Sequence, residues 1–160
     1  METILNEAIA LRETGDYHAS RLLLCTLLGD SQYVDKANLH IAWSYDNEGK
    51  EKQALIHYHL ALEGELSTTE RFDALFGVAS TYRSLGKYTE ALEYFERTIA
   101  EYPDSFEVQP FYAMCLYNLG RHKEATTSLI KLLLSTTESK RIKSYQRAIL
   151  LYAEDLDKTW

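Results

Sequence analysis

Apolar residues recur along this chain with the period of an α-helix, and glycines interrupt the pattern at regular distances. Gly15, Gly49, Gly86 and Gly120 are separated by 34, 37 and 34 residues. Each glycine follows an apolar-periodic run, which is where a helix ends, because glycine adopts the left-handed conformation there at little cost. The pattern therefore predicts helices joined by glycine turns.

Three further columns of residues keep the same register relative to these glycines. Alanine stands seven residues before each glycine, a small residue stands five residues after it, and a large apolar residue stands nine residues after it. Small side chains let two antiparallel helices approach closely, and the large residue fills the space beyond their contact. The three columns are Ala8, Ala42, Ala79 and Ala113; Ser20, Ala54, Ala91 and Ala125; and Leu24, Tyr58, Phe95 and Leu129.

This spacing resembles the 34-residue pattern of the tetratricopeptide repeat family. The third repeat carries the family's spacing throughout, with Leu75, Val78, Ala79, Tyr82, Ala91, Phe95 and Pro103. The resemblance implies an all-α fold, a right-handed α-solenoid of antiparallel helix pairs. Residues 1–160 would form a single domain, with repeats at about 2–34, 35–68, 69–105 and 106–137 and a capping helix at about 138–158.

Two places depart from the regular pattern. Three extra residues lie between the second and third repeats. In this connection Gly64 is predicted to end one helix, and Ser67 to Glu70 are predicted to open the next one with a capping box. Pro110 removes a backbone donor from the fourth repeat, so the first helix of that repeat should start near Gln109 or kink.

The chain after the fourth repeat is predicted to form a last helix that opens at Ser135 to Glu138, again with the sequence STTE. Ala148 follows Ala113 by 35 residues, so this helix occupies the place of a fifth first helix. Its charged residues would provide the polar outer face of a terminal cap.

Composition is that of a soluble globular protein, with 46% hydrophobic and 26% charged residues. A net charge of −7 argues against nucleic acid as a partner. No apolar stretch approaches the roughly 18 residues of a membrane helix. The N-terminal residues lack the pattern of a signal peptide, so a cytoplasmic location without a membrane partner is expected.

No constellation of residues predicts catalysis. The sequence lacks a phosphate-binding loop, a nucleophile elbow and paired carboxylates, so neither an enzyme nor a cofactor is expected. His57 and His59 are two residues apart and should point in different directions, which argues against a metal site. Cys25 and Cys115 are predicted to be buried free thiols.

The family resemblance implies a concave groove, lined by the first helix of each pair, that binds an extended peptide or a partner helix. The expected function is thus a protein–protein interaction module or scaffold. A chaperone-type carboxylate clamp is excluded, because the clamp positions hold no lysine, arginine or asparagine. The partner-binding residues carried over by register are Leu39, Trp43, Asp46, Phe76, Arg83, Met114, Tyr117 and Asn118. The same register also gives Glu2, Leu5, Ile9, Arg12, Lys36, Asp73, Ser80 and Glu107.

Three alternatives stay open at this level. The groove residues could simply pack against neighbouring repeats or the last helix. The chain could be a structural protein that forms a homodimer through the groove or through the last helix, or a regulatory domain that senses a peptide. The apolar residues of the last helix that would support a homodimer are Ile142, Tyr145, Ile149 and Tyr152.

Overall fold

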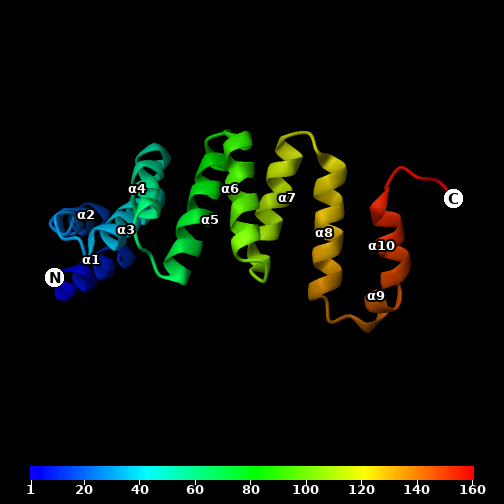
Figure 1. Ribbon diagram of the computed structural model, residues 1–160, viewed down its shortest axis with the longest axis horizontal. Coiled ribbons are helices and arrows are strands. Elements are labelled where there is room, and N and C mark those ends of the chain that lie inside the picture. Colours follow the sequence, from blue (N-terminus) through cyan, green and yellow to red (C-terminus); the bar gives the residue numbers. More distant parts are fainter. The chain divides into compact units, whose positions relative to one another are not determined.

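The computed structural model describes all residues from Met1 to Trp160 (Figure 1). It contains ten α-helices, one short 3₁₀ helix and no β-strand, so the predicted all-α fold class is confirmed. The chain forms two compact units, Met1–Tyr94 and Phe95–Trp160, which we call unit 1 and unit 2.

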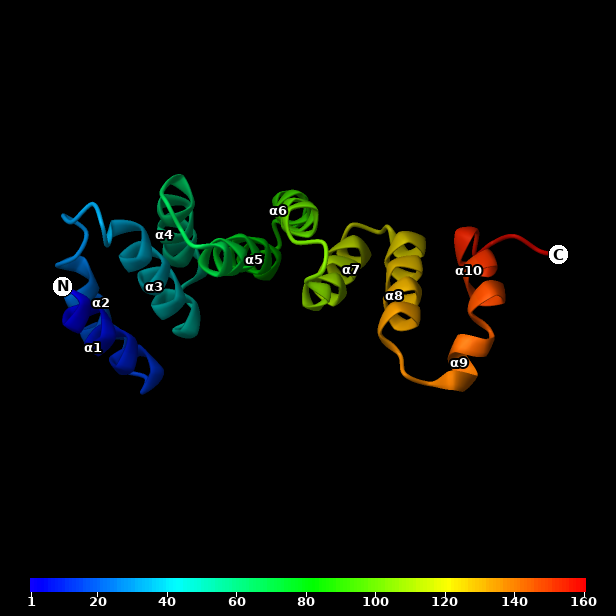
Figure 2. The same cartoon turned by 60° about the horizontal axis from the view of Figure 1, so that its bottom comes forward.

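Unit 1 is built from helix pairs. In the pairs α1–α2 and α3–α4 the first helix packs on the helix that follows it, and neighbouring pairs meet through α2 with α3 and through α4 with α5. The first helices α1, α3 and α5 also contact one another in that order (Figure 2). The helices are α1 (Glu2–Glu13), α2 (Tyr17–Cys25), α3 (Val34–Asn47), α4 (Glu51–Glu63), α5 (Thr68–Ser84) and the first half of α6 (Tyr88–Glu101).

Unit 2 contains the remainder of α6 and the last helices of the chain. Helix α8 packs on α7 on one side and on α10 on the other. Thr127 in α8 donates a hydrogen bond from its hydroxyl to the carbonyl oxygen of Ala153 in α10, at 3.0 Å. The elements after α6 are a 3₁₀ helix (Phe106–Val108), α7 (Gln109–Asn118), α8 (His122–Thr136), α9 (Lys140–Ser144) and α10 (Gln146–Glu154).

The four predicted glycine turns are confirmed. Gly15, Gly49, Gly86 and Gly120 have φ between 71° and 89°, and no other residue has a positive φ. In each turn the amide after the glycine donates to the carbonyl four residues before the glycine, as Lys87 does to Tyr82 at 2.9 Å. This is the Schellman motif, which satisfies the last carbonyls of a helix.

The alanine columns lie at buried helix contacts, as the register predicted. Ser20 replaces alanine in the first repeat, and its hydroxyl donates to the carbonyl oxygen of Ala8 at 2.7 Å, so this polar group is satisfied where it is buried. Leu129 breaks the third column, because 45% of its surface is exposed, whereas Leu24, Tyr58 and Phe95 are buried.

The connection between α4 and α5 confirms two local predictions. Gly64 is the C-cap of α4 with an extended backbone, and a Cβ there would lie about 2 Å from the carboxylate atoms of Asp35. That carboxylate accepts the amide proton of Glu65 at 2.8 Å. Ser67 and Glu70 form the predicted capping box of α5.

Pro110 acts as predicted, because α7 begins at Gln109 and places the proline in its first turn, where no backbone donor is needed. The predicted start of the last helix is wrong. Helix α8 continues to Thr136, and Ser139 caps α9 instead by accepting from the amide of Ile142. The last helix is also interrupted at Tyr145, which separates α9 from α10.

Cys115 is buried, but Cys25 is exposed at the end of α2, which corrects the prediction for that residue. None of the helices combines the length and the hydropathy that crossing a membrane would require.

Candidate partner-binding groove

The first helices of unit 1 enclose an open hollow of about 440 Å³. It lies along α1, α3 and α5, the helices that sequence register assigned to the concave side. We call it the first-helix groove, and its lining residues are Arg12, Trp43, Asn47, Tyr58, Asp73, Phe76, Gly77 and Ser80.

Trp43 is a half-buried aromatic wall of this groove, contributed by α3. Its ring packs edge-on against His40, with centroids 4.8 Å apart. The guanidinium carbon of Arg12 lies 5.3 Å from the indole centroid, within the range of a cation–π contact. These two neighbours hold the indole in one orientation.

Arg12 and His40 both carry a buried nitrogen without a hydrogen-bond partner, Nε of Arg12 and Nδ1 of His40. Burial, reinforced by the positive charge of Arg12, lowers the pKa of His40 to about 4. His40 is therefore neutral at neutral pH. Arg12 supplies the positive charge at this end of the groove, and only 16% of its side chain is exposed.

The floor of the groove is made by Tyr58 from α4. Its hydroxyl donates to the carboxylate of Asp46 at 2.5 Å, and the ring lies against Gly77 of α5. A Cβ at Gly77 would lie 2.5 Å from Cζ of Tyr58, so only glycine leaves room for the ring. Thr81 donates to the same carboxylate at 3.3 Å.

Asp46 is consequently the acceptor of a half-buried hydrogen-bond network next to the groove. Burial raises the pKa of Asp46, and the hydrogen bonds from Tyr58 and Thr81 offset part of that rise. Burial and the neighbouring Asp46 also raise the pKa of Tyr58. Asp46 was predicted to contact a partner, whereas it is half-buried and is not among the lining residues of the groove.

Helix α5 provides the opposite wall. Phe76 is half-buried and packs near Phe72, with ring centroids 5.9 Å apart. Asp73 and Ser80 lie one turn before and after Phe76 on the same face, as the helical repeat requires. Burial, with a smaller contribution from the charge of Glu70, raises the pKa of Asp73.

The structure brings Trp43 and Phe76 together with three further register positions, because Arg12, Asp73 and Ser80 line the same groove. Leu39 is a correction, since it is completely buried in the core with Ala42 and Val78. Its position on α3 faces the contact with α4 and α5, so no surface is left for a partner. Arg83 is half-buried in the last turn of α5, outside the lining.

In unit 2, α7 carries the other three predicted residues. Met114 and Tyr117 are exposed, and Asn118 is half-buried. The ring of Tyr117 lies 4.7 Å from that of His122 in α8. The sequence thus located accessible side chains on this helix.

Three lining residues, Asn47, Tyr58 and Gly77, were not among the predicted ones. Asn47 follows Trp43 by four residues on α3, and that helical spacing could have identified it. Tyr58 belongs to a column assigned to helix packing, and only the absence of a side chain at Gly77 lets it reach the groove.

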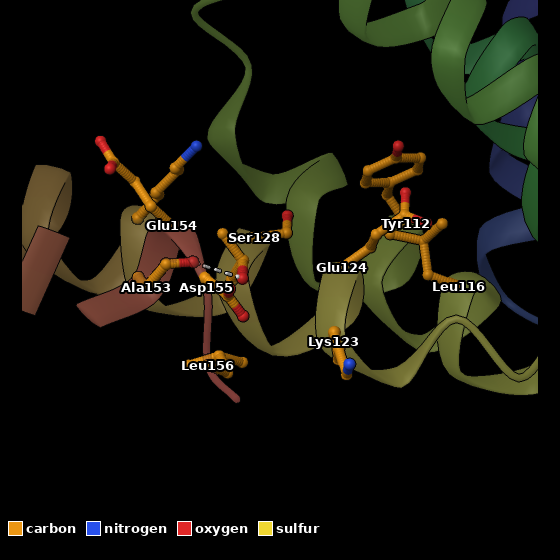
Figure 3. A pocket seen from close by; sticks show the side chains of 11 residues that line it. Tyr112, Leu116, Lys123, Glu124, Ser128, Ala153, Glu154, Asp155 and Leu156 are labelled. Atoms are coloured by element: carbon orange, nitrogen blue, oxygen red, sulfur yellow. Dashed lines mark hydrogen bonds between the residues drawn. The ribbon is translucent and has the colours of Figure 1, made fainter. Parts of the chain in front are cut away.

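Unit 2 has its own hollow of about 440 Å³, where α10 packs on α8 (Figure 3). Tyr112 and Leu116 lie on one side, with Ala153, Asp155 and Leu156 on the other. Two of the charged side chains there form ion pairs within the chain, Glu124 with Arg121 at 2.6 Å and Lys123 with Asp157. We assign this hollow to the packing of the last helix.

The two neighbouring histidines point in different directions, as predicted. Nδ1 of His57 lies 2.8 Å from Oδ1 of Asn38, whereas Nε2 of His59 lies 3.0 Å from the hydroxyl of Tyr82. Burial lowers the pKa of both imidazoles. Each histidine is therefore part of a packing contact between helices.

A family model described as "Tetratrico peptide repeat" matches residues 35–156, which is most of the chain. The chain belongs to the tetratricopeptide repeat family. Proteins of this family are generally non-catalytic modules for protein–protein interaction.

Two solved structures share the fold of this tetratricopeptide repeat chain. The crystal structure of MamA protein has a TM-score of 0.72 and 18% identity, over 92% of this chain and 75% of that one. A tetratricopeptide repeat protein from Parabacteroides merdae ATCC 43184 has a TM-score of 0.74 and 20% identity, over 96% of this chain. The chain spans 59% of the length of that second protein. Among curated proteins none matches this chain significantly.

Proposed function

We propose that this chain is an interaction module that binds a peptide or helix of another protein in the first-helix groove. The observation that carries the proposal is that Trp43 and Phe76, from neighbouring helices, line one hollow and remain half-exposed. Aromatic side chains of this kind dominate binding hot spots, because a partner can bury a large rigid surface against them.

The lining also suggests the chemistry of the partner. Arg12 lies at the Trp43 end, and its Nε has no hydrogen-bond partner within the chain. Asp73 and Ser80 add polar groups on α5. An amphipathic segment with a large apolar residue for the two rings and an acidic residue for Arg12 fits this arrangement.

Affinity capture with paired variants tests the groove. Ser80→Arg adds a long side chain to the lining without removing a core residue, and Trp43→Ala removes one aromatic wall. Both variants should lose the proteins that the wild type captures, because a hot-spot residue contributes about 2 kcal/mol or more. The matched control is Ile56→Ala on α4, which alters an apolar residue that is 60% exposed outside the groove.

Capture of the same proteins by all variants would contradict the proposal. A direct measurement uses peptides selected from a random library and the fluorescence of Trp43 in a Trp160→Phe background, since the chain contains only two tryptophans. Bound peptides should change the emission of Trp43, and Ser80→Arg should abolish that change.

Met114, Tyr117 and Asn118 on α7 are proposed to add a second contact surface. Support comes from the exposure of Met114 and Tyr117. Truncating Tyr117 to alanine should weaken capture of the same partner. The cytoplasmic location and the peptide-sensing alternative stay predictions from the sequence.

A further inference from the structure

The segment formed by α9 and α10 presents an apolar hollow of about 400 Å³, and the only ring contact within the chain at its border is that of Trp160 with Tyr152, with centroids 6.0 Å apart. Its surface is formed by Ile142, Tyr145, Ala148, Ile149 and Tyr152, with Arg141 at its N-terminal border. Tyr145 is 67% exposed and Tyr152 is 53% exposed. Monomeric proteins rarely leave a contiguous apolar face of this kind in water.

The repeat register explains what this face lacks. In each of the four repeats, the alanine seven residues before the glycine is buried. In the pairs α1–α2, α3–α4 and α7–α8, the first helix is covered by the second helix that follows it. Ala148 stands in the same column, 35 residues after Ala113, but is only half-buried and lines the hollow. The hollow is thus the vacant position of a second helix.

We propose that a second copy of this chain fills the vacancy, with the two last helices antiparallel across a two-fold axis. The apolar residues Ile142, Tyr145, Ile149 and Tyr152 have spacings of 3, 4 and 3, which read the same in both directions. A two-fold axis at the middle of the set therefore places each isoleucine opposite a tyrosine of the other copy. Ala148 lies near that axis, and its small side chain permits close approach.

Charge at the two ends of the helix favours the same arrangement. Lys140 and Arg141 precede the apolar set, and Glu154 and Asp155 follow it, all of them exposed. Antiparallel pairing brings the basic end of one copy to the acidic end of the other, and the two-fold axis repeats that contact. A parallel pairing would bring like charges together. The contact is short and sits at the lower limit of specific interfaces, about 1,000 Å² in total, so a reversible dimer is expected.

Sedimentation of the full chain over a wide range of concentrations tests the dimer. The apparent mass should rise from 18.4 kDa toward twice that value as concentration increases. Tyr145→Arg should keep the chain monomeric throughout that range. Tyr117→Arg is the matched control, because it makes the same change at a tyrosine of unit 2 that is 63% exposed outside the hollow, and it should dimerise like the wild type.

A wild type that is strictly monomeric overturns the proposal. The occupant of the hollow would then be a different protein. Equal loss of the dimer in Tyr145→Arg and Tyr117→Arg also overturns it, since the contact would then lie elsewhere.

Charge exchange tests the antiparallel geometry. One variant carries Lys140→Glu, Arg141→Glu, Glu154→Lys and Asp155→Lys together, which exchanges the charges of the two ends. This variant should dimerise with itself, whereas it should form no heterodimer with a labelled wild type, because antiparallel pairing would bring like charges together at both ends. Circular dichroism confirms that the variant keeps the wild-type helix content. Heterodimers of the folded variant with the wild type overturn the antiparallel arrangement, since only parallel pairing would then bring opposite charges together. Ser80→Arg in the first-helix groove should dimerise like the wild type. A failure of the dimer proposal can therefore be distinguished from a failure of the proposed partner binding.

Discussion

At the scale of single residues, Tyr58 connects the packing of unit 1 to its candidate binding surface. Its ring fills the space that the missing side chain of Gly77 leaves, and its hydroxyl binds Asp46 at 2.5 Å. The hydroxyl of Thr81 lies 3.3 Å from the same carboxylate, so residues of α3, α4 and α5 meet at one half-buried carboxylate. A shared acceptor of this kind restricts how these helices can shift.

Gly77→Ala should therefore destabilise the protein, although alanine is the better helix former by about 1 kcal/mol. The added methyl group would overlap the Tyr58 ring, and relief by moving the ring would cost the Asp46 hydrogen bond. Overpacking of this kind costs about 1 to 3 kcal/mol. Urea unfolding measures the change, and a variant as stable as the wild type would show that Tyr58 moves freely.

His40 should make stability depend on pH. Its folded pKa of about 4 lies below the ordinary value of 6.5, so the unfolded state binds more protons between these values. Stability is then complete above pH 6.5 and decreases as the pH falls toward 4, by up to about 2 kcal/mol between pH 7 and pH 5. Lys36 and Arg12 act in the same direction, whereas Glu70 opposes it.

The unfolding free energy of the wild type and of His40→Phe, measured at pH 7 and pH 5, checks this prediction. The variant should lose less stability on acidification than the wild type. Burial also lowers the pKa of His57 and His59, so these residues add to the loss of stability on acidification. Both proteins contain them, and their contribution is therefore the same in the two measurements. Identical losses in the two proteins would assign the pH dependence to those other histidines.

At the scale of elements, four glycine turns end the first helices by the same motif. Gly86 has a φ of +74°, and an added Cβ would meet nothing within 4 Å. The requirement for glycine there is thus a matter of backbone conformation, whereas at Gly77 it is a matter of space.

Gly86→Ala should consequently cost about 1 to 2 kcal/mol through backbone strain alone. Gly86→Asn should cost less, because asparagine adopts the left-handed conformation more readily. Thermal unfolding of the two variants gives the comparison. Equal destabilisation by alanine and asparagine would indicate a steric cause that the structure does not contain.

At the scale of the whole molecule, exposed apolar residues are unevenly distributed. Eleven of the fifteen exposed large hydrophobic residues belong to unit 2, which is the shorter unit. Unit 1 instead offers a defined groove with aromatic walls. The first-helix groove and the proposed contact with a second copy therefore lie in different units.

This separation predicts independent effects of mutation. Ser80→Arg should abolish partner capture and leave the concentration-dependent mass unchanged, whereas Tyr145→Arg should do the reverse. The double variant should lose both properties. Its change in the free energy of unfolding should equal the sum of the changes in the two single variants, since sites without shared contacts behave additively. Partner capture that also disappears in Tyr145→Arg would show that binding requires the dimer.

Much of the fold was predictable because it depends on local chemistry. The glycine turns, the capping box at Ser67 and the delayed start of α7 at Pro110 each follow from the conformational preference of one or two residues. The start of the last helix was not predictable in this way. The same letters, STTE, open a helix at Ser67 and lie at the end of α8 at Ser135. At the second site the hydroxyls of Ser135 and Thr136 donate to the carbonyl oxygen of Leu132 within α8, so they do not cap a new helix.

The sequence by itself determined the family, the repeat register and the helices that carry the candidate groove, since all three follow from periodicity along the chain. The tertiary structure decided which side chains of those helices remain accessible. Leu39 and Trp43 lie one turn apart on the same helix, yet only Trp43 reaches the groove, because α4 and α5 cover the position of Leu39. Exposure depends on contacts between distant segments, and a one-dimensional pattern does not record how completely neighbouring helices cover a residue.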